Sequence, residues 1–124
     1  MYFSSDKLDV WDAGTWCQDN VGYLVEILTE PQMDFIIMEL QVFEVHEGQQ
    51  LWWTSGSATN REGKWYWQHT LQDVGTFVWD EGFPQTRTDN NYLCLRYDDY
   101  LGYDCYARNS EGVIYESHYI CQQD

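Results

Sequence analysis

The sequence predicts a single α+β domain, in which two helices come first and short strands follow. Three observations lead to this prediction. Helical periodicity stops at Gly48, short aromatic runs separated by Gly, Asn, Asp and Ser follow it, and the chain has only 124 residues. A chain of this length buries roughly two-thirds of its unfolded surface in one core. We therefore expect one domain over residues 1–124.

The first helix is expected to begin near Asp6, because Ser4 and Ser5 can cap it there. Its inward face is small and apolar and carries the first cysteine. The members of that face fall at i, i+3 and i+7: Val10, Ala13 and Cys17. Gly22 ends this element, and residues 23–27 are predicted to form a short strand with Leu24 and Val25 in the core.

A second helix begins after the segment Thr29-Glu30-Pro31-Gln32, which has the pattern of a capping box with proline in the first turn. Apolar residues then keep the i, i+3, i+4, i+7 spacing of one buried stripe, and Gly48 ends the helix. The stripe consists of Met33, Ile36, Ile37, Leu40 and Phe43.

Strands and long loops are expected after Gly48. The candidate strands are residues 51–54, 64–67, 76–79, 92–95, 105–107 and 117–121. The stretch from Asp80 to Asn91 is too long for a simple hairpin and has only Phe83 and Pro84 as apolar residues, so we expect a functional loop there.

The many aromatic residues divide into two expected groups. Those in strand candidates are expected to be core residues: Trp53, Trp65, Trp67 and Trp79. Those around the loops are candidates for ligand contact, because an aromatic ring offers a flat apolar face with a polar handle. They are Phe83, Tyr92, Tyr97, Tyr100 and Tyr103.

The four cysteines are an even set, with one early in the chain and three near its end. They form no C-x-x-C pair and have no histidine at metal-ligand spacing, which argues against a zinc site or a redox motif. Disulfides are therefore expected, and with them a secreted, extracellular protein. The alternative is a cytosolic protein with four buried free thiols. If disulfides form, four cysteines allow three different pairings, and the spacing leaves all three open.

The chain is strongly acidic, with 21 acidic against 6 basic residues and a formal charge of -15. This charge repels phosphate backbones and anionic headgroups, so neither nucleic acid nor a membrane surface is an expected partner. The longest apolar run, residues 35–38, is far too short to span a membrane.

Several short segments of the chain, taken in order, form a recognisable series. They are Tyr2-Phe3-Ser4, Ala13-x-x-x-Cys17, Gly22-Tyr23-Leu24, the helix over 33–40, Trp53-Thr54-Ser55-Gly56, Gly63-Lys64-Trp65-Tyr66-Trp67, the segment 77–85 and Ile120-Cys121-Gln122. Together with the three downstream cysteines, this series resembles the C-type lectin-like domain in its short, four-cysteine form, and especially invertebrate and arthropod members. The resemblance implies a C-type lectin-like fold of two helices, an antiparallel sheet and a long irregular loop region.

The resemblance also implies two disulfides, Cys17 with Cys121 and Cys94 with Cys105. The first would tie the first helix to the last strand. The second would hold the base of the expected binding loop.

Members of this family that bind sugars generally do so through one calcium ion held by hard oxygen ligands. The family's Glu-Pro-Asn or Gln-Pro-Asp tripeptide matches Phe83-Pro84-Gln85, and its Trp-Asn-Asp run matches Gly102-Tyr103-Asp104. The family's acidic residue before the third-from-last cysteine falls near Tyr92. The resemblance thus implies a ligand-binding set of Phe83, Pro84, Gln85, Tyr92, Tyr103 and Asp104.

This set is poor in calcium ligands. One amide and one carboxylate cannot supply the roughly six to eight oxygens that calcium takes. We therefore expect no metal ligands and no cofactor, with calcium as the alternative if Asp98 and Asp99 are the true counterparts of the family's acids.

No catalytic residue is expected. His46, His69 and His118 are isolated from one another and from any nucleophile arrangement. The paired acids Asp98-Asp99 and Asp80-Glu81 are adjacent, so in a strand they would point to opposite faces and could not act together.

The function expected from these features is extracellular recognition of a glycan or glycoprotein by a C-type lectin-like protein with a degenerate calcium site. The alternative is a calcium-independent module for protein binding or self-assembly, present as a homo- or hetero-oligomer. The tyrosine-rich loops favour this alternative, because tyrosine is typical of protein-binding hot spots.

Overall fold

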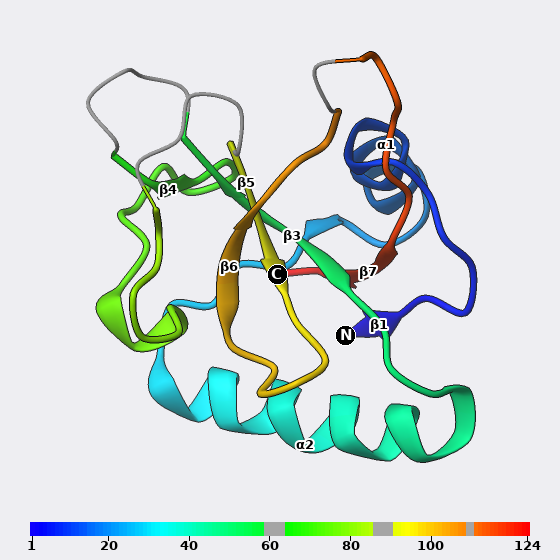
Figure 1. The fold of residues 1–124 in the computed structure, drawn as a ribbon, viewed down its shortest axis with the longest axis horizontal. Coiled ribbons are helices and arrows are strands. Elements are labelled where there is room, and N and C mark those ends of the chain that lie inside the picture. The colour runs from blue at the N-terminus through cyan, green and yellow to red at the C-terminus, as the bar shows by residue number, and fades with distance from the viewer. Residues whose placement is uncertain (59–63, 86–90, 109–110) are drawn as a thin grey trace.

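The computed structural model describes residues 1–58, 64–85, 91–108 and 111–124. The elements follow in the order β1 (Tyr2–Phe3), α1 (Val10–Asn20), β2 (Tyr23–Leu24), α2 (Glu30–Glu47), β3 (Trp52–Ser57), β4 (Tyr66–Trp67), a short 3-10 helix η1 (Thr76–Val78), β5 (Tyr92–Leu95), β6 (Gly102–Cys105) and β7 (His118–Gln122). Two helices and a sheet confirm the predicted α+β class (Figure 1).

The strands form one sheet in the order β1-β7-β3-β5-β6, with β2 added to β7 and β4 added to β3. The pairing of β3 with β7 is parallel, whereas the other strand pairs are antiparallel. The sheet is therefore mixed, whereas the family resemblance implied an antiparallel one. A parallel pair needs a crossover connection of roughly a dozen residues or more, and β3 and β7, which are far apart in the chain and lie side by side in the sheet, meet this condition.

The sheet separates two hydrophobic cores, because successive residues of a strand point to opposite faces. Trp52 of β3 belongs to the core under α2, together with Ile36 and Leu40 of that helix. Trp53, the next residue, belongs to the core under α1, together with Ala13 of that helix. The strands β5 and β7 alternate between the two cores in the same way.

Helix α1 begins at Val10, about one turn later than predicted, with Asp9 as its N-cap. Ser4 does not cap it. This residue is buried, its backbone N–H donates to the Tyr119 carbonyl at 3.0 Å, and its hydroxyl accepts from the Tyr119 N–H at 2.9 Å. Pairing with β7 thus keeps the chain extended where local preference alone favoured a helix.

Helix α2 agrees with the prediction. Both hydrogen bonds of the capping box between Thr29 and Gln32 are present, and Gly48 caps the other end. Of the predicted stripe, Met33, Ile36 and Leu40 are buried, and Ile37 and Phe43 are partly buried against the same core.

Some strand predictions need correction. Residues 76–78 form η1 and not a strand, and the strand predicted at 105–107 ends at Cys105. The second shift follows from pairing with β5, since Gly102 lies opposite Leu95 and Cys105 lies opposite Tyr92, the last and first residues of that strand. The strand predicted at 23–27 is limited to β2.

Both predicted disulfides are present. Cys17–Cys121 joins α1 to β7 across 104 residues, and Cys94–Cys105 joins β5 to β6 across 11 residues. No cysteine is free, which removes the alternative of buried thiols. The four tryptophans behave as packing residues, with Trp53 and Trp67 buried and Trp65 against Trp79 at 4.8 Å between ring centroids.

The buried histidine of β7 predicts a pH dependence of stability. His118 is 4% exposed, packs against Trp52 and hydrogen-bonds the Ser4 carbonyl through Nδ1 at 3.1 Å. Burial lowers its pKa, so the unfolded chain binds the proton more readily than the folded protein does. This contribution to stability is full above the ordinary histidine pKa of about 6.5 and is lost as the pH falls below it.

We therefore expect the free energy of unfolding, measured with urea, to decrease between about pH 7 and pH 5. The variant His118→Gln should show a flatter profile than the wild type over this range. The exposed His46 provides the control, since His46→Gln should keep the wild-type slope. An identical slope in His118→Gln would show that other groups cause the dependence.

Candidate functional site

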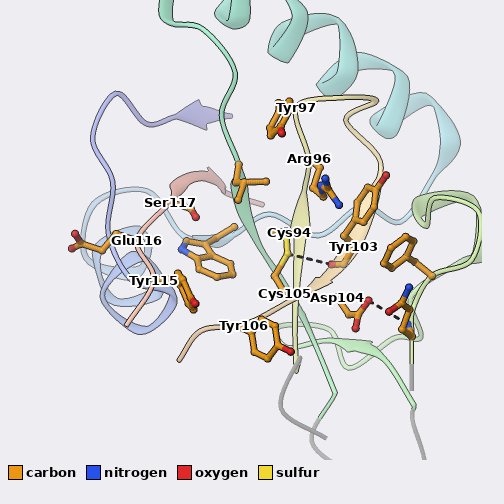
Figure 2. Close-up of a pocket in the computed structure, with 14 residues that line it drawn as sticks. Cys94, Arg96, Tyr97, Tyr103, Asp104, Cys105, Tyr106, Tyr115, Glu116 and Ser117 are labelled. Carbon is orange, nitrogen blue, oxygen red and sulfur yellow. Dashed lines mark hydrogen bonds between the residues drawn. A yellow bond between two sulfur atoms is a disulfide. The ribbon is translucent and has the colours of Figure 1, made fainter. Parts of the chain in front are cut away.

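A hollow of about 560 Å³ lies over the Cys94–Cys105 disulfide. Figure 2 shows Arg96, Tyr103 and Asp104 on one side of the disulfide, and Tyr115, Glu116 and Ser117 on the other. The hollow thus spans the β5–β6 hairpin and the segment that leads into β7. Its lining residues are Leu51, Trp53, Phe83, Gln85, Cys94, Arg96, Tyr97, Tyr103, Asp104, Cys105, Tyr106, Tyr115, Glu116 and Ser117.

Three side chains in contact with one another form one wall of the hollow. The Phe83 and Tyr103 rings lie 4.2 Å apart between centroids. The Arg96 guanidinium lies 4.2 Å from the centroid of the Tyr103 ring, and its Nη2 is 3.5 Å from Asp98 Oδ2. Arg96 therefore binds an aromatic face and a carboxylate of its own hairpin.

The Tyr103 hydroxyl joins two carboxylates behind this wall. It donates to Asp80 Oδ2 and lies 3.1 Å from Asp99 Oδ2. Hydrogen bonds from Asp99 and Tyr103 lower the pKa of Asp80, whereas burial and the neighbouring Asp80 raise the pKa of Asp99. Burial and both carboxylates raise the pKa of Tyr103, so the phenol keeps its proton and holds the Asp80 segment against β6.

Backbone hydrogen bonds fix the predicted binding loop to β6. The Asp80 N–H donates to the Gly102 carbonyl at 3.1 Å, and the Phe83 N–H donates to the Asp80 carbonyl at 3.1 Å. Farther along, the Gln85 N–H donates to Asp104 Oδ1 at 3.2 Å. The Phe83–Pro84 peptide bond is cis. Phe83 is therefore held at the hollow from both sides.

Four of the six predicted ligand-binding residues come together in this hollow: Phe83, Gln85, Tyr103 and Asp104. Pro84 lines a neighbouring hollow of about 650 Å³ that also includes Trp65 and Trp79, and Phe83 lines both. Tyr92 lies apart from the others. Its ring contacts Trp11 of α1 at 5.8 Å, and it lines a third hollow with Tyr66 and Leu71.

Of the further contact candidates, Tyr97 lines the main hollow, whereas Tyr100 is only 5% exposed and packs in the core. The prediction of Tyr100 as a contact residue is wrong because its side chain turns inward at the hairpin turn. Sequence reasoning missed Arg96, Tyr106, Tyr115 and Glu116. The density of tyrosines from Tyr92 to Tyr115 was a signal for this region, but it did not show which rings share a face.

The described residues supply few of the oxygen ligands by which this family holds calcium. Phe83 stands where the family supplies an oxygen ligand, and the Asp104 carboxylate already accepts from the Gln85 N–H. In the described ranges, no group of three or more His, Cys, Asp or Glu side chains is placed to hold a metal ion. Asp89, in the same loop, lies outside the described residues.

Neither helix of the described chain is long and apolar enough to cross a membrane.

Comparison with known families identifies the fold. A family model described as the lectin C-type domain matches residues 6–123. The chain belongs to the C-type lectin family. Members of this family are non-catalytic recognition proteins, so this C-type lectin domain is not an enzyme. No curated protein sequence matches the chain.

Solved structures of low sequence identity share this fold. The mouse scavenger receptor C-type lectin carbohydrate-recognition domain is 21% identical with a TM-score of 0.78, covering 99% of this chain and 87% of that one. Human lithostathine is 18% identical with a TM-score of 0.79, covering 99% and 90%. A calcium-independent type II antifreeze protein is 17% identical with a TM-score of 0.74, covering 97% and 82%.

Proposed function

We propose that this C-type lectin domain is an extracellular recognition domain that binds glycans or glycoproteins through the hollow beside Phe83, without a calcium ion. The observation that carries the proposal is the wall of Phe83, Tyr103 and Arg96 beside an open hollow of about 560 Å³. Aromatic faces stack on the apolar faces of sugar rings, and ligand pockets typically measure about 300–1,000 Å³. The two disulfides support an extracellular location, because disulfides persist in oxidising compartments.

The charges around the hollow favour a neutral or amino sugar over an anionic one. Asp104 and Glu116 line the hollow, and three carboxylates against one lysine line the neighbouring one: Asp73, Asp80, Glu81 and Lys64. Arg96, a cation of the main hollow, already binds Asp98 and the Tyr103 ring. An added carboxylate or sulfate would therefore meet like charges in a protein of net charge -15.

Calcium-independent protein binding at the same hollow is the second candidate. The observation that favours it is the group of tyrosines at the rim, Tyr97, Tyr106 and Tyr115. Tyrosine is enriched at the centres of protein interfaces, where it combines contact area with a polar hydroxyl. The same wall residues would then contact a protein partner, in a homo- or hetero-oligomer.

An array of neutral, amino and anionic glycans, measured with calcium and with excess EDTA, tests the proposal. We expect binding to neutral or amino glycans that EDTA does not change, and weaker binding to anionic ones. Phe83→Ala should lower the affinity about tenfold, which corresponds to about 1.4 kcal/mol, because the stacking face is lost. Trp11→Ala removes an exposed aromatic ring outside the hollow and serves as the control.

The alternatives give different results in the same experiment. Binding abolished by EDTA would show that calcium is required and would overturn the proposal. Glycan binding unchanged in Phe83→Ala would place the site elsewhere. No glycan binding, together with capture of a protein that Phe83→Ala releases, would favour the second candidate.

A further inference from the structure

The outer face of α2 carries a continuous row of exposed apolar side chains. Phe35, Met38, Val42 and Val45 are 48%, 65%, 60% and 82% exposed. Single exposed apolar residues are common and need no explanation, but a contiguous row of four large ones indicates an interaction surface. In Figure 1, α2 runs along the bottom edge of the molecule, beyond the turn of the β5–β6 hairpin.

The four residues share one face because of their spacing. They follow one another at intervals of three, four and three residues, which is the spacing of a coiled-coil seam at a and d positions. At about 1.5 Å per residue, the row is about 15 Å long. The buried residues Met33, Ile36 and Leu40 lie on the opposite side of the helix, so this helix is apolar on two faces and only one of them is covered.

The charges on the helix indicate what would cover the second face. Its 18 residues include five carboxylates and no Lys or Arg. Asp34 and Glu39 are exposed and lie on opposite sides of the apolar row, at the g and e positions that flank a coiled-coil seam. A partner that covers the row therefore has to place its own flanking side chains next to carboxylates.

We propose that the outer face of α2 binds a cationic amphipathic helix of a partner protein. The row of Phe35, Met38, Val42 and Val45 would pack against the apolar stripe of that helix, and its Lys or Arg residues would meet Asp34 and Glu39. Flanking charges of this kind set partner choice in paired helices. This surface is separate from the hollow, so the inference does not depend on the proposed function.

A second copy of the chain fits this face less well. In a parallel pairing, Asp34 of one helix would face Glu39 of the other. In an antiparallel pairing with Phe35 opposite Val45, the two copies of Glu39 would face each other. Either arrangement brings like charges together between two molecules that each carry a charge of -15.

A synthetic amphipathic peptide with Leu at its a and d positions and Lys at its e and g positions is the probe. Its lysines also prevent the peptide from pairing with itself. Binding of the fluorescently labelled peptide to the whole domain is measured by anisotropy at low and high salt. Two matched peptides accompany it: a scrambled peptide of the same composition, and one with Glu in place of Lys.

We expect the Lys peptide to bind more tightly than the scrambled one by about tenfold or more, the Glu peptide not to bind, and high salt to weaken binding. The double variant Met38→Gln with Val42→Gln should lose about tenfold in affinity. Val113→Gln, at another exposed apolar residue, should bind normally. These substitutions are at the surface, so circular dichroism should show folded proteins in all cases.

Three results would overturn the proposal. Equal binding of the scrambled peptide would show attraction by charge alone. Unchanged affinity in the Met38→Gln, Val42→Gln variant would show that the row is not the binding face. A dimer in analytical ultracentrifugation that the same double variant dissociates would assign the face to a second copy of the chain.

Discussion

Replacing Cys17 and Cys121 by alanine is expected to lower the free energy of unfolding by about 4 to 5 kcal/mol in the chain-entropy model. Replacing Cys94 and Cys105 is expected to cost about 3 kcal/mol in the same model. The difference follows from loop length, since the first disulfide closes a loop of 104 residues and the second a loop of 11. Removal of the long-range bridge therefore gives the unfolded chain more conformational freedom than removal of the short-range one.

Urea denaturation of the two double variants under identical conditions measures this difference. The Cys94–Cys105 pair lines the hollow, so its removal should also weaken glycan binding. The Cys17–Cys121 pair joins α1 to β7 away from the hollow, so this variant, where still folded, should bind normally. A larger loss of stability in the Cys94, Cys105 variant would contradict the account.

Replacing Glu26 by alanine is expected to lower the free energy of unfolding by about 3 kcal/mol. Each hydrogen bond to a charged group contributes about 1.5–3 kcal/mol, and in the variant water can replace the carboxylate in some of these bonds. The Glu26 side chain is buried, and its Oε2 accepts from the N–H groups of His69 and Thr70 at 2.7 and 3.1 Å. It also accepts from the Ser55 hydroxyl at 3.3 Å. This carboxylate therefore holds the turn after β4 against β3.

The variant Glu26→Gln separates the role of the oxygen from that of the charge. Its amide oxygen can still accept from both backbone N–H groups, so it should be destabilised by about 1 kcal/mol. Urea denaturation compares the two variants. If Glu26→Ala were no less stable than Glu26→Gln, the hydrogen bonds to residues 69 and 70 would not stabilise the fold as the structure indicates.

The parts of the fold that the sequence predicted well depend on local signals. Helix α2 was found from its capping box, its buried stripe and Gly48, all within about 20 residues of one another. The start of α1 was wrong because Ser4 makes its bonds to Tyr119, far along the chain, and no local pattern reveals that pairing. The strand at 105–107 was misplaced for a similar reason, since the bounds of β6 follow from its register against β5, from Leu95 opposite Gly102 to Tyr92 opposite Cys105.

In the candidate site, too, the residues in recognisable motifs were predicted, whereas those brought in by tertiary contacts were not. Phe83, Gln85 and Asp104 were found by matching family motifs, and the hollow brings them together. Tyr92 lies two residues before Cys94 in β5 but lines a different hollow, at the end of the strand that approaches Trp11. Arg96 and Tyr115 line the same hollow from opposite sides of the disulfide, because the β5–β6 hairpin lies next to the segment that leads into β7. No spacing in the sequence encodes that arrangement.

The hollow beside Phe83 is proposed to recognise a neutral or amino glycan without calcium. The most direct test of this proposal is a titration of the isotope-labelled domain with such a glycan in excess EDTA, followed by two-dimensional NMR. We expect chemical-shift changes concentrated at residues that line the hollow, among them Phe83, Arg96, Tyr103, Tyr106 and Tyr115. Shifts that occur only when calcium replaces EDTA, or that cluster around Tyr66, Leu71 and Tyr92, would contradict it.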